Sequence, residues 1–250
     1  MDRTHRASYF KRRLKSQEAF NNYMYARKHL QHIVMDSTGA YTELCQLGKI
    51  CQIDKSPYNE TNGGHRHPYT AVYSMLFAPL KNKPIMFAEI GVAGGGSVVM
   101  WWNYFEKARL SFFDRDQNFL NNVINMRLPH NQPYTGIVDV RVDGDVGRAI
   151  MEACIAANEL KPPMFDVILD DSSHDYADQI RIIKECWPHI NSGGYMIVED
   201  VYRSIPEADF ERDLESVLPE CSEAYFVVCN HEERYSPGWN NDKLLILVKA

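Results

Sequence analysis

Short apolar runs alternate with helical patterns from residue 84 to the end of this 250-residue chain. The runs are rich in Val, Ile and Phe and too short for helices, as in FDVILDD (165–171) and GYMIVED (194–200), so they predict buried strands. Strands that alternate with helices are joined by right-handed crossovers into a parallel sheet covered on both faces. The sequence therefore predicts an α/β fold with a Rossmann-like, doubly wound, mostly parallel seven-stranded sheet.

The predicted elements divide the chain into two parts. Residues 6–35 have long side chains and neither Gly nor Pro, which predicts a helix, and 68–80 predicts an amphipathic helix with Pro68 in its first turn. We therefore expect an N-terminal helical extension over residues 1–80, acting as a lid or an oligomer arm, and an α/β domain over residues 81–250. The predicted strands are 85–92, 110–114, 138–142, 165–171, 194–200, 224–230 and 243–249.

Composition narrows the class of protein. No window approaches 18 uninterrupted apolar residues, and MDRTHRASYFKRRLK (1–15) lacks the apolar core of a secretory signal, so we expect no membrane span and no secretion. The six cysteines form no CxxC pair, which argues against a zinc ribbon or a dithiol redox site. Several lie in apolar stretches typical of small core residues, and a reducing, cytoplasmic location fits this usage.

The charge is distributed unevenly. The net charge is −6, yet residues 1–35 hold eight Lys or Arg against two acids, so the rest of the chain is strongly acidic. This argues against a protein that coats nucleic acid over its whole surface. The basic segment is most simply a solvated helix face, and it is also compatible with a homo-oligomer.

Acidic residues close two neighbouring strands. Asp170, Asp171 and His174 follow the first strand, and Glu199 and Asp200 end the second. In a parallel sheet the carboxyl ends of adjacent strands open onto one crevice, where ligands bind. Carboxylates this close repel one another unless a cation or a proton joins them. A hard divalent ion held through oxygen atoms, such as Mg²⁺, is the economical explanation.

A glycine-rich turn follows the first predicted strand, in the order Glu89, Gly91, Gly94 and Ser97. Glycines let the backbone approach a ligand closely, and the helix that opens here offers free N–H groups to an anion. The dinucleotide pattern GxGxxG is broken at Ala93, so the turn alone indicates a nucleotide or nucleoside only weakly.

Two further acids follow the next strands. Asp114 lies at the end of the second predicted strand. A carboxylate at this position typically binds the ribose hydroxyls of an adenosine-type cofactor. Asp145, in the turn 143–145 after the third predicted strand, is a candidate contact for the adenine. Plain strand-end turns would explain both acids equally well.

The pieces AEIGVAGGGS, FFDRDQ, ILDDSSH, VED and NNDKLLILVK together resemble the class I S-adenosylmethionine-dependent methyltransferases. Within that class they are similar to the macrocin O-methyltransferase family, which methylates sugar hydroxyls of macrolides. The resemblance covers about residues 53–250, including Asp54-Lys55-Ser56 and His67-Pro68-Tyr69. It implies that 81–250 is the catalytic domain and that S-adenosylmethionine and Mg²⁺, or another hard divalent ion, are the cofactors.

The resemblance also assigns residues. It implies that Asp171, Glu199 and Asp200 are the metal ligands and His174 the general base, with Asp171 also counted as catalytic. The family's usual glycine in the DDGSH pattern is Ser172 here, which puts the turn's backbone conformation in doubt. Whether Asp170 faces the cofactor or the sheet interior stays open.

The expected chemistry is methyl transfer to a hydroxyl of a sugar or small polyol, either free or in a glycan. A divalent ion lowers the pKa of a hydroxyl that it binds, and a histidine can take the proton near neutral pH. Two alternatives remain: a metal-dependent hydroxylase resembling cephalosporin hydroxylase, and a methyltransferase that acts on RNA. The all-carboxylate trio argues against the first, since non-haem iron usually takes two His and one carboxylate. Only the basic N-terminal segment favours the second.

Overall fold

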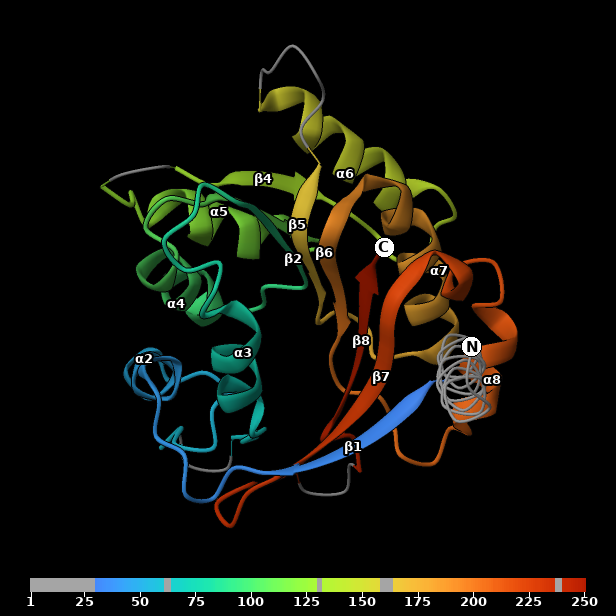
Figure 1. The fold of residues 1–250 in the computed structure, drawn as a ribbon. Helices are drawn as coiled ribbons and strands as arrows, with labels where there is room; N and C mark the ends of the chain where they lie inside the picture. The colour runs from blue at the N-terminus through green and yellow to red at the C-terminus, as the bar shows by residue number, and fades with distance from the viewer. Residues whose placement is uncertain (1–29, 61–63, 130–131, 158–163, 237–239) are drawn as a thin grey trace, which may run out of the picture.

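The computed structural model describes residues 30–60, 64–129, 132–157, 164–236 and 240–250 (Figure 1). The strands are β1 (Gln31–Asp36), β2 (Met86–Ile90), β3 (Arg109–Asp114), β4 (Tyr134–Ile137), β5 (Phe165–Asp170), β6 (Ile190–Val198), β7 (Cys221–Asn230) and β8 (Lys243–Lys249). The α-helices are α2 (Glu43–Cys51), α3 (Tyr69–Phe77), α4 (Gly96–Tyr104), α5 (Gln117–Asn125), α6 (Asp145–Ala156), α7 (Tyr176–Cys186) and α8 (Glu207–Asp213), and short 3₁₀ turns cover Trp187–His189 and Leu218–Glu220.

These strands form one sheet in the order β1-β7-β8-β6-β5-β2-β3-β4. Strand β8 is antiparallel to β6 and β7, and the other neighbouring strands are parallel. The predicted doubly wound, mostly parallel fold is confirmed. Strands β3 and β4 lie on one side of β2, whereas β5 lies on its other side. The direction in which the chain adds strands therefore reverses between β2 and β5. Such a switch point is where ligands bind in open α/β sheets.

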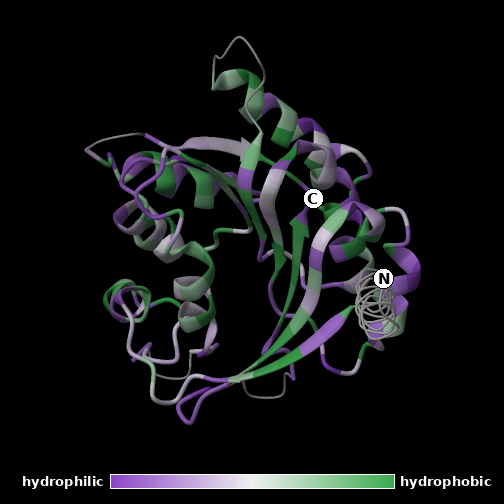
Figure 2. Cartoon of the chain, viewed as in Figure 1, coloured by the Kyte–Doolittle hydropathy of each residue, from purple (hydrophilic) through white to green (hydrophobic). Residues whose placement is uncertain are grey.

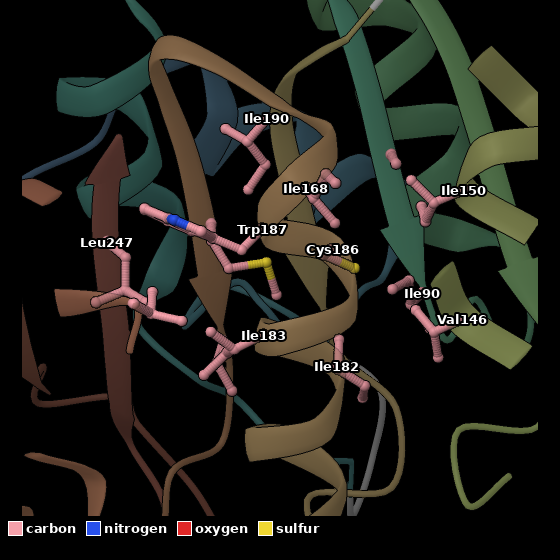
Figure 3. Close-up of a cluster of buried hydrophobic side chains, with 14 of the residues drawn as sticks. Ile90, Val146, Ile150, Ile168, Ile182, Ile183, Cys186, Trp187, Ile190 and Leu247 are labelled. Atoms are coloured by element: carbon pink, nitrogen blue, oxygen red, sulfur yellow. The ribbon is translucent and has the colours of Figure 1, made fainter. Parts of the chain in front are cut away.

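Two apolar layers hold the helices against the sheet. Helices α6, α7 and α8 cover one face, and α2, α3, α4 and α5 cover the other (Figure 1). Figure 3 shows the first layer, where Ile183 and Cys186 of α7 pack beside Ile168 of β5. Hydrophobic residues line the central strands, as Figure 2 shows, because those strands are buried on both faces. No helix in the described ranges is long and apolar enough to cross a bilayer.

The eighth strand, β1, corrects the prediction for the N-terminal segment. Most of the helix predicted over residues 6–35 lies outside the described residues, but its last residues form β1, parallel to β7. The β-branched pair Ile33 and Val34 favours a strand, and the edge of β7 supplies its hydrogen-bonding partner. Both side chains are exposed. Residues 1–80 therefore do not act only as a helical extension, because they contribute a strand to the main sheet.

Strand β4 also differs from the prediction, which placed a strand at 138–142. The paired residues are Tyr134–Ile137, opposite Ser111–Asp114 of β3. The alternation that suggested a strand is real, because Val138 and Val140 are buried. However, β3 ends at Asp114, whose carbonyl accepts the last bond, from Val138 N at 3.0 Å. Beyond that point the chain turns, with Val142 N donating to Asp139 O at 2.9 Å, and residues 138–141 line the cavity described below.

Candidate active site

A cavity of about 720 Å³ opens at the carboxyl ends of β2 and β5, at the switch point of the sheet. It is lined by the glycine turn (residues 91–96), Asp114, residues 138–141, residues 171–174 and the segment 52–55. This volume lies within the range of small-molecule and cofactor sites. The cavity therefore joins the predicted cofactor turn to one of the predicted acidic strand ends.

The glycine turn is in direct contact with the acidic strand end. Gly91 has φ of +92°, and a Cβ atom built on it would lie 2.1 Å from the carbonyl oxygen of Asp171. Only glycine fits this close approach in the left-handed region. Gly94 also lines the cavity, but nothing lies within 4 Å of the Cβ position it lacks.

Asp114 shapes the same turn. Its Oδ2 accepts hydrogen bonds from Val92 N at 3.0 Å and Ala93 N at 3.2 Å, and its Oδ1 accepts one from Asp116 N at 2.9 Å. The carboxylate thus anchors the turn and also lines the cavity. Each oxygen has two lone-pair directions, so these bonds leave acceptor capacity for a ligand hydroxyl.

Glu89 and Ser97 form the wall behind the turn. Glu89 is fully buried, and its Oε2 accepts a 2.8 Å hydrogen bond from Ser97 Oγ. Burial raises the pKa of Glu89 to about 7, although the nearby Lys55 ammonium opposes the shift. Ser97 lines the cavity, so Glu89 reaches it through Ser97.

Asp145 lies outside the cavity lining. Its Oδ2 accepts from Asp139 N at 2.8 Å and its Oδ1 accepts from the Arg148 guanidinium at 2.6 Å. Asp139 and Arg141 line the cavity instead. Hydrogen bonds from Arg141 lower the pKa of Asp139 to about 2, so this part of the lining carries a paired carboxylate.

The acidic strand ends converge as the sequence suggests. Single ligand atoms of Asp171, His174 and Asp200 lie within 4.8 Å of one another, a spacing that suits one metal ion. His174 Nε2 lies 3.6 Å from Asp200 Oδ2. His174 and Asp200 both have positive φ, 58° and 55°. Such conformations cost energy in residues other than glycine and cluster at functional sites.

Glu199 is not part of this group. It is buried, its Oε1 accepts a 2.6 Å hydrogen bond from Tyr73 OH, and its Oε2 lies 3.0 Å from Lys55 Nζ. Burial raises the pKa of Glu199 well above its usual range despite the Lys55 charge. Asp171 also contacts Lys55 Nζ, so the two predicted ligands Asp171 and Glu199 share one ammonium group.

Asp170 belongs to neither the cavity lining nor the metal-sized group. It is 2% exposed, and it accepts hydrogen bonds from Ser172 N at 3.2 Å and Ser172 Oγ at 2.6 Å. Burial raises the pKa of Asp170 to about 7. Ser172 itself is not among the residues with positive φ, so serine fits where the family has glycine.

Three residues that the site prediction did not include hold the acids in place. They are Lys55, Tyr69 and Tyr73, and Tyr69 OH donates to Asp200 Oδ1 at 2.6 Å. The spacing of the two tyrosines, four residues apart on α3, puts them on one helix face. The signals in the sequence were that spacing and the similarity of Asp54-Lys55-Ser56 and His67-Pro68-Tyr69 to the family. Neither reveals that these side chains reach the strand ends.

Comparison with known proteins agrees with the fold. Residues 88–201 match a family model described as a methyltransferase domain. This stretch contains β2 to β6 with the glycine turn, Asp114 and the acidic strand ends. This part of the chain is therefore similar to a methyltransferase domain.

The similar curated proteins are sugar O-methyltransferases. The 8-demethyl-8-alpha-L-rhamnosyl tetracenomycin-C 2'-O-methyltransferase of Streptomyces olivaceus is 29% identical over 55% of this chain and 34% of its own length. The mycinamicin VI 2''-O-methyltransferase of Micromonospora griseorubida is 26% identical over 59% of this chain and 35% of its own. The chain spans about a third of the length of these relatives. The predicted resemblance to the macrocin O-methyltransferase group is confirmed.

A solved structure shares the fold. The MycE methyltransferase of the mycinamycin biosynthetic pathway, in complex with Mg and SAH, superposes with a TM-score of 0.58 at 18% identity. The match covers 84% of this chain and 55% of that protein.

Proposed function

We propose that the protein is an S-adenosylmethionine-dependent, divalent-metal-assisted O-methyltransferase that acts on a hydroxyl of a sugar or small polyol. One observation carries the proposal: the glycine turn and the acidic strand end line one cavity and touch at Gly91 and Asp171. A methyl donor bound at the turn would then lie beside the groups that activate the acceptor. The similar proteins that are named for sugar O-methylation support the choice of acceptor.

The cavity fits the donor. The backbone of the glycine turn admits a ligand closely, and Asp114 offers acceptor capacity to ribose hydroxyls. Val138 and Val140 give an apolar surface at the same cavity, suited to the adenine ring. When bound, S-adenosylmethionine supplies a sulfonium methyl group. The acceptor oxygen forms the new bond to that carbon while the carbon–sulfur bond breaks and its electron pair stays on sulfur.

The acidic group fits a divalent ion. Asp171 and Asp200 offer carboxylate oxygens at metal spacing, and Glu199 is the third ligand implied by the family, buried beside them against Lys55 and Tyr73. The ion would lower the pKa of an acceptor hydroxyl and fix its position.

His174 is the proposed general base. It lines the cavity beside Asp171, and a proton taken up by its ring is stabilised by the Asp200 carboxylate, 3.6 Å from Nε2. Histidine is the side chain suited to proton uptake near neutral pH. The hydroxyl thus loses its proton to His174 as its oxygen attacks the methyl carbon. Holding acceptor and donor in line supplies much of the rate.

The geometry does not favour the iron hydroxylase. Among the described residues, the metal-sized group has one histidine and two carboxylates, the reverse of the usual two-His, one-carboxylate iron site.

The test combines calorimetry with a methyl-transfer assay on a panel of glycosides and deoxysugar nucleotides. We expect S-adenosylmethionine to bind with or without metal, and methyl transfer to stop when a chelator is added. His174→Ala should lower the transfer rate by about 10²–10⁴-fold and leave Mg²⁺ affinity unchanged. A large loss of Mg²⁺ affinity in that variant would make His174 a ligand instead of the base. Absence of S-adenosylmethionine binding, or product hydroxylation with Fe(II) and a 2-oxoacid, would overturn the proposal.

A further inference from the structure

Lys55 lies at the centre of the acidic site, although it comes from a loop far from the sheet in sequence. Its side chain is 2% exposed. A buried ammonium group is costly unless it is paired and hydrogen-bonded. Its surroundings meet this condition, because the Nζ atom is in contact with three carboxylates.

Two of these contacts are hydrogen bonds and the third is an ion pair. Nζ donates to Glu199 Oε2 at 3.0 Å and to Asp171 Oδ2, and it lies 3.2 Å from Glu89 Oε1. The ammonium group is therefore hydrogen-bonded to two carboxylates and electrostatically paired with a third. The three carboxylates surround the ammonium group and so stabilise its positive charge.

The backbone of Lys55 is fixed to the helix that supplies the other partners. Its carbonyl oxygen accepts hydrogen bonds from Tyr69 N at 3.1 Å and Thr70 N at 3.2 Å, in the first turn of α3. The same helix sends Tyr69 to Asp200 and Tyr73 to Glu199. Lys55 and α3 therefore form one unit that reaches both acidic strand ends.

We propose that Lys55 is a built-in cation of the acidic site: it neutralises the inner side of the carboxylate cluster, so that a single divalent ion suffices for the outer side. In this role Lys55 is a positioning residue. It contacts Asp171, which belongs to the metal-sized group. It also contacts Glu89, which bonds to Ser97 beside the glycine turn. The inference deepens the proposed metal-assisted function and rests on it for its meaning.

Replacement of the charge by a neutral chain of similar length tests the proposal. In Lys55→Met the cluster loses its internal cation, and its buried carboxylates repel one another. We expect a lower melting temperature in chelator and, because a positive charge near the ion is gone, Mg²⁺ or Mn²⁺ binding tighter by about tenfold or more. Added Mn²⁺ should then raise the melting temperature of the variant more than that of the wild type.

Lys243→Met is the matched control. Lys243 is also buried, and it pairs with Glu207 and lies 4.0 Å from the Phe226 ring centroid, away from the cavity. This variant should lose stability to the same extent with and without Mn²⁺, and its affinity for the ion should match that of the wild type.

A double variant keeps the test decisive if Lys55→Met does not fold. At pH 8, Lys55→Met with Glu89→Gln removes the ammonium group together with one of its carboxylates, so it should be more stable than Lys55→Met alone. The proposal is overturned if the double variant is no more stable, or if Lys55→Met binds the ion as the wild type does. If the protein binds the ion with this dependence on Lys55 but transfers no methyl group, the proposed function is wrong and the proposed role of Lys55 is supported.

Discussion

The glycine turn and the acidic site lie on one cavity but are built in different ways. The turn is held by partners close in sequence: Asp114 bonds to residues 21 and 22 positions before it, and Ser97 bonds to Glu89, eight positions away. The acidic site is held by residues more than a hundred positions away, since Lys55, Tyr69 and Tyr73 reach Asp171, Glu199 and Asp200 over separations of 116 to 144.

The two regions also differ in electrostatics. Backbone N–H groups donate hydrogen bonds to the carboxylate that anchors the turn, whereas buried side chains donate hydrogen bonds to the carboxylates of the acidic site. Burial, followed by nearby carboxylates, raises the pKa values of Tyr69 and Tyr73 well above the usual range, so they remain neutral donors. A glycine turn can thus be stabilised by partners close in sequence, whereas a cluster of like charges needs partners from distant parts of the chain.

The largest effect is expected where the two regions touch. Gly91→Ala places a methyl group against the Asp171 carbonyl in a left-handed backbone, and we expect a loss of about 4 kcal/mol in the free energy of unfolding. Urea denaturation measures it. Gly94→Ala is the control, because its Cβ position is open, and should change stability by about 0.5 kcal/mol or less. Equal losses in both variants would mean that the close approach is absent.

The next largest effect concerns pH. The pKa of Glu89 is about 7 in the fold, above its model-peptide value of 4.5, so the folded state holds the proton more tightly. Stability contributed by this protonation is complete below about pH 4.5 and is lost as the pH rises toward about 7. The decrease in the free energy of unfolding between acidic and alkaline pH should be smaller in Glu89→Gln by up to about 3 kcal/mol. Denaturation at pH 5 and pH 8 checks it, and an unchanged slope would show that Glu89 does not carry the shift.

A smaller effect is expected at the tyrosine supports. Tyr73→Phe leaves Glu199 buried without one of its two partners, which should cost about 1–3 kcal/mol of stability and weaken Mg²⁺ binding. Tyr104→Phe, also buried but on α4, is the control and should leave Mg²⁺ affinity unchanged. If both variants bind Mg²⁺ as the wild type does, the acidic site does not depend on α3.

The smallest effect concerns S-adenosylmethionine affinity. It compares Asp145, which the sequence predicts as a cofactor contact, with Asp139, which lines the cavity. Asp145→Asn should change S-adenosylmethionine affinity by less than about twofold, because Asp145 lies outside the cavity lining. Asp139→Asn, within the lining, should weaken it about tenfold. Calorimetry with the donor alone compares them. The reverse order would restore Asp145 as the cofactor contact.

Much of the fold follows from local patterns. The apolar runs that end in Asp171 and Asp200 predict buried strands, and parallel strands bring their carboxyl ends to one edge whatever the details of packing. The glycine turn is also predictable, because its glycines show where the backbone leaves ordinary conformations, whereas the contacts of the turn with Asp114 and Asp171 come from the fold. Periodicity misplaced β4 by a few residues because an alternating pattern persists after the partner strand ends.

The sequence by itself determined the α/β sheet, the glycine turn and the meeting of acids at neighbouring strand ends, because each depends on residues near one another in the chain. Only the tertiary structure decided that Lys55 lies between the carboxylates and that β1 joins the sheet. These features arise from the packing of segments far apart in the chain, and the identity of a charged residue does not reveal which distant partner will stabilise it.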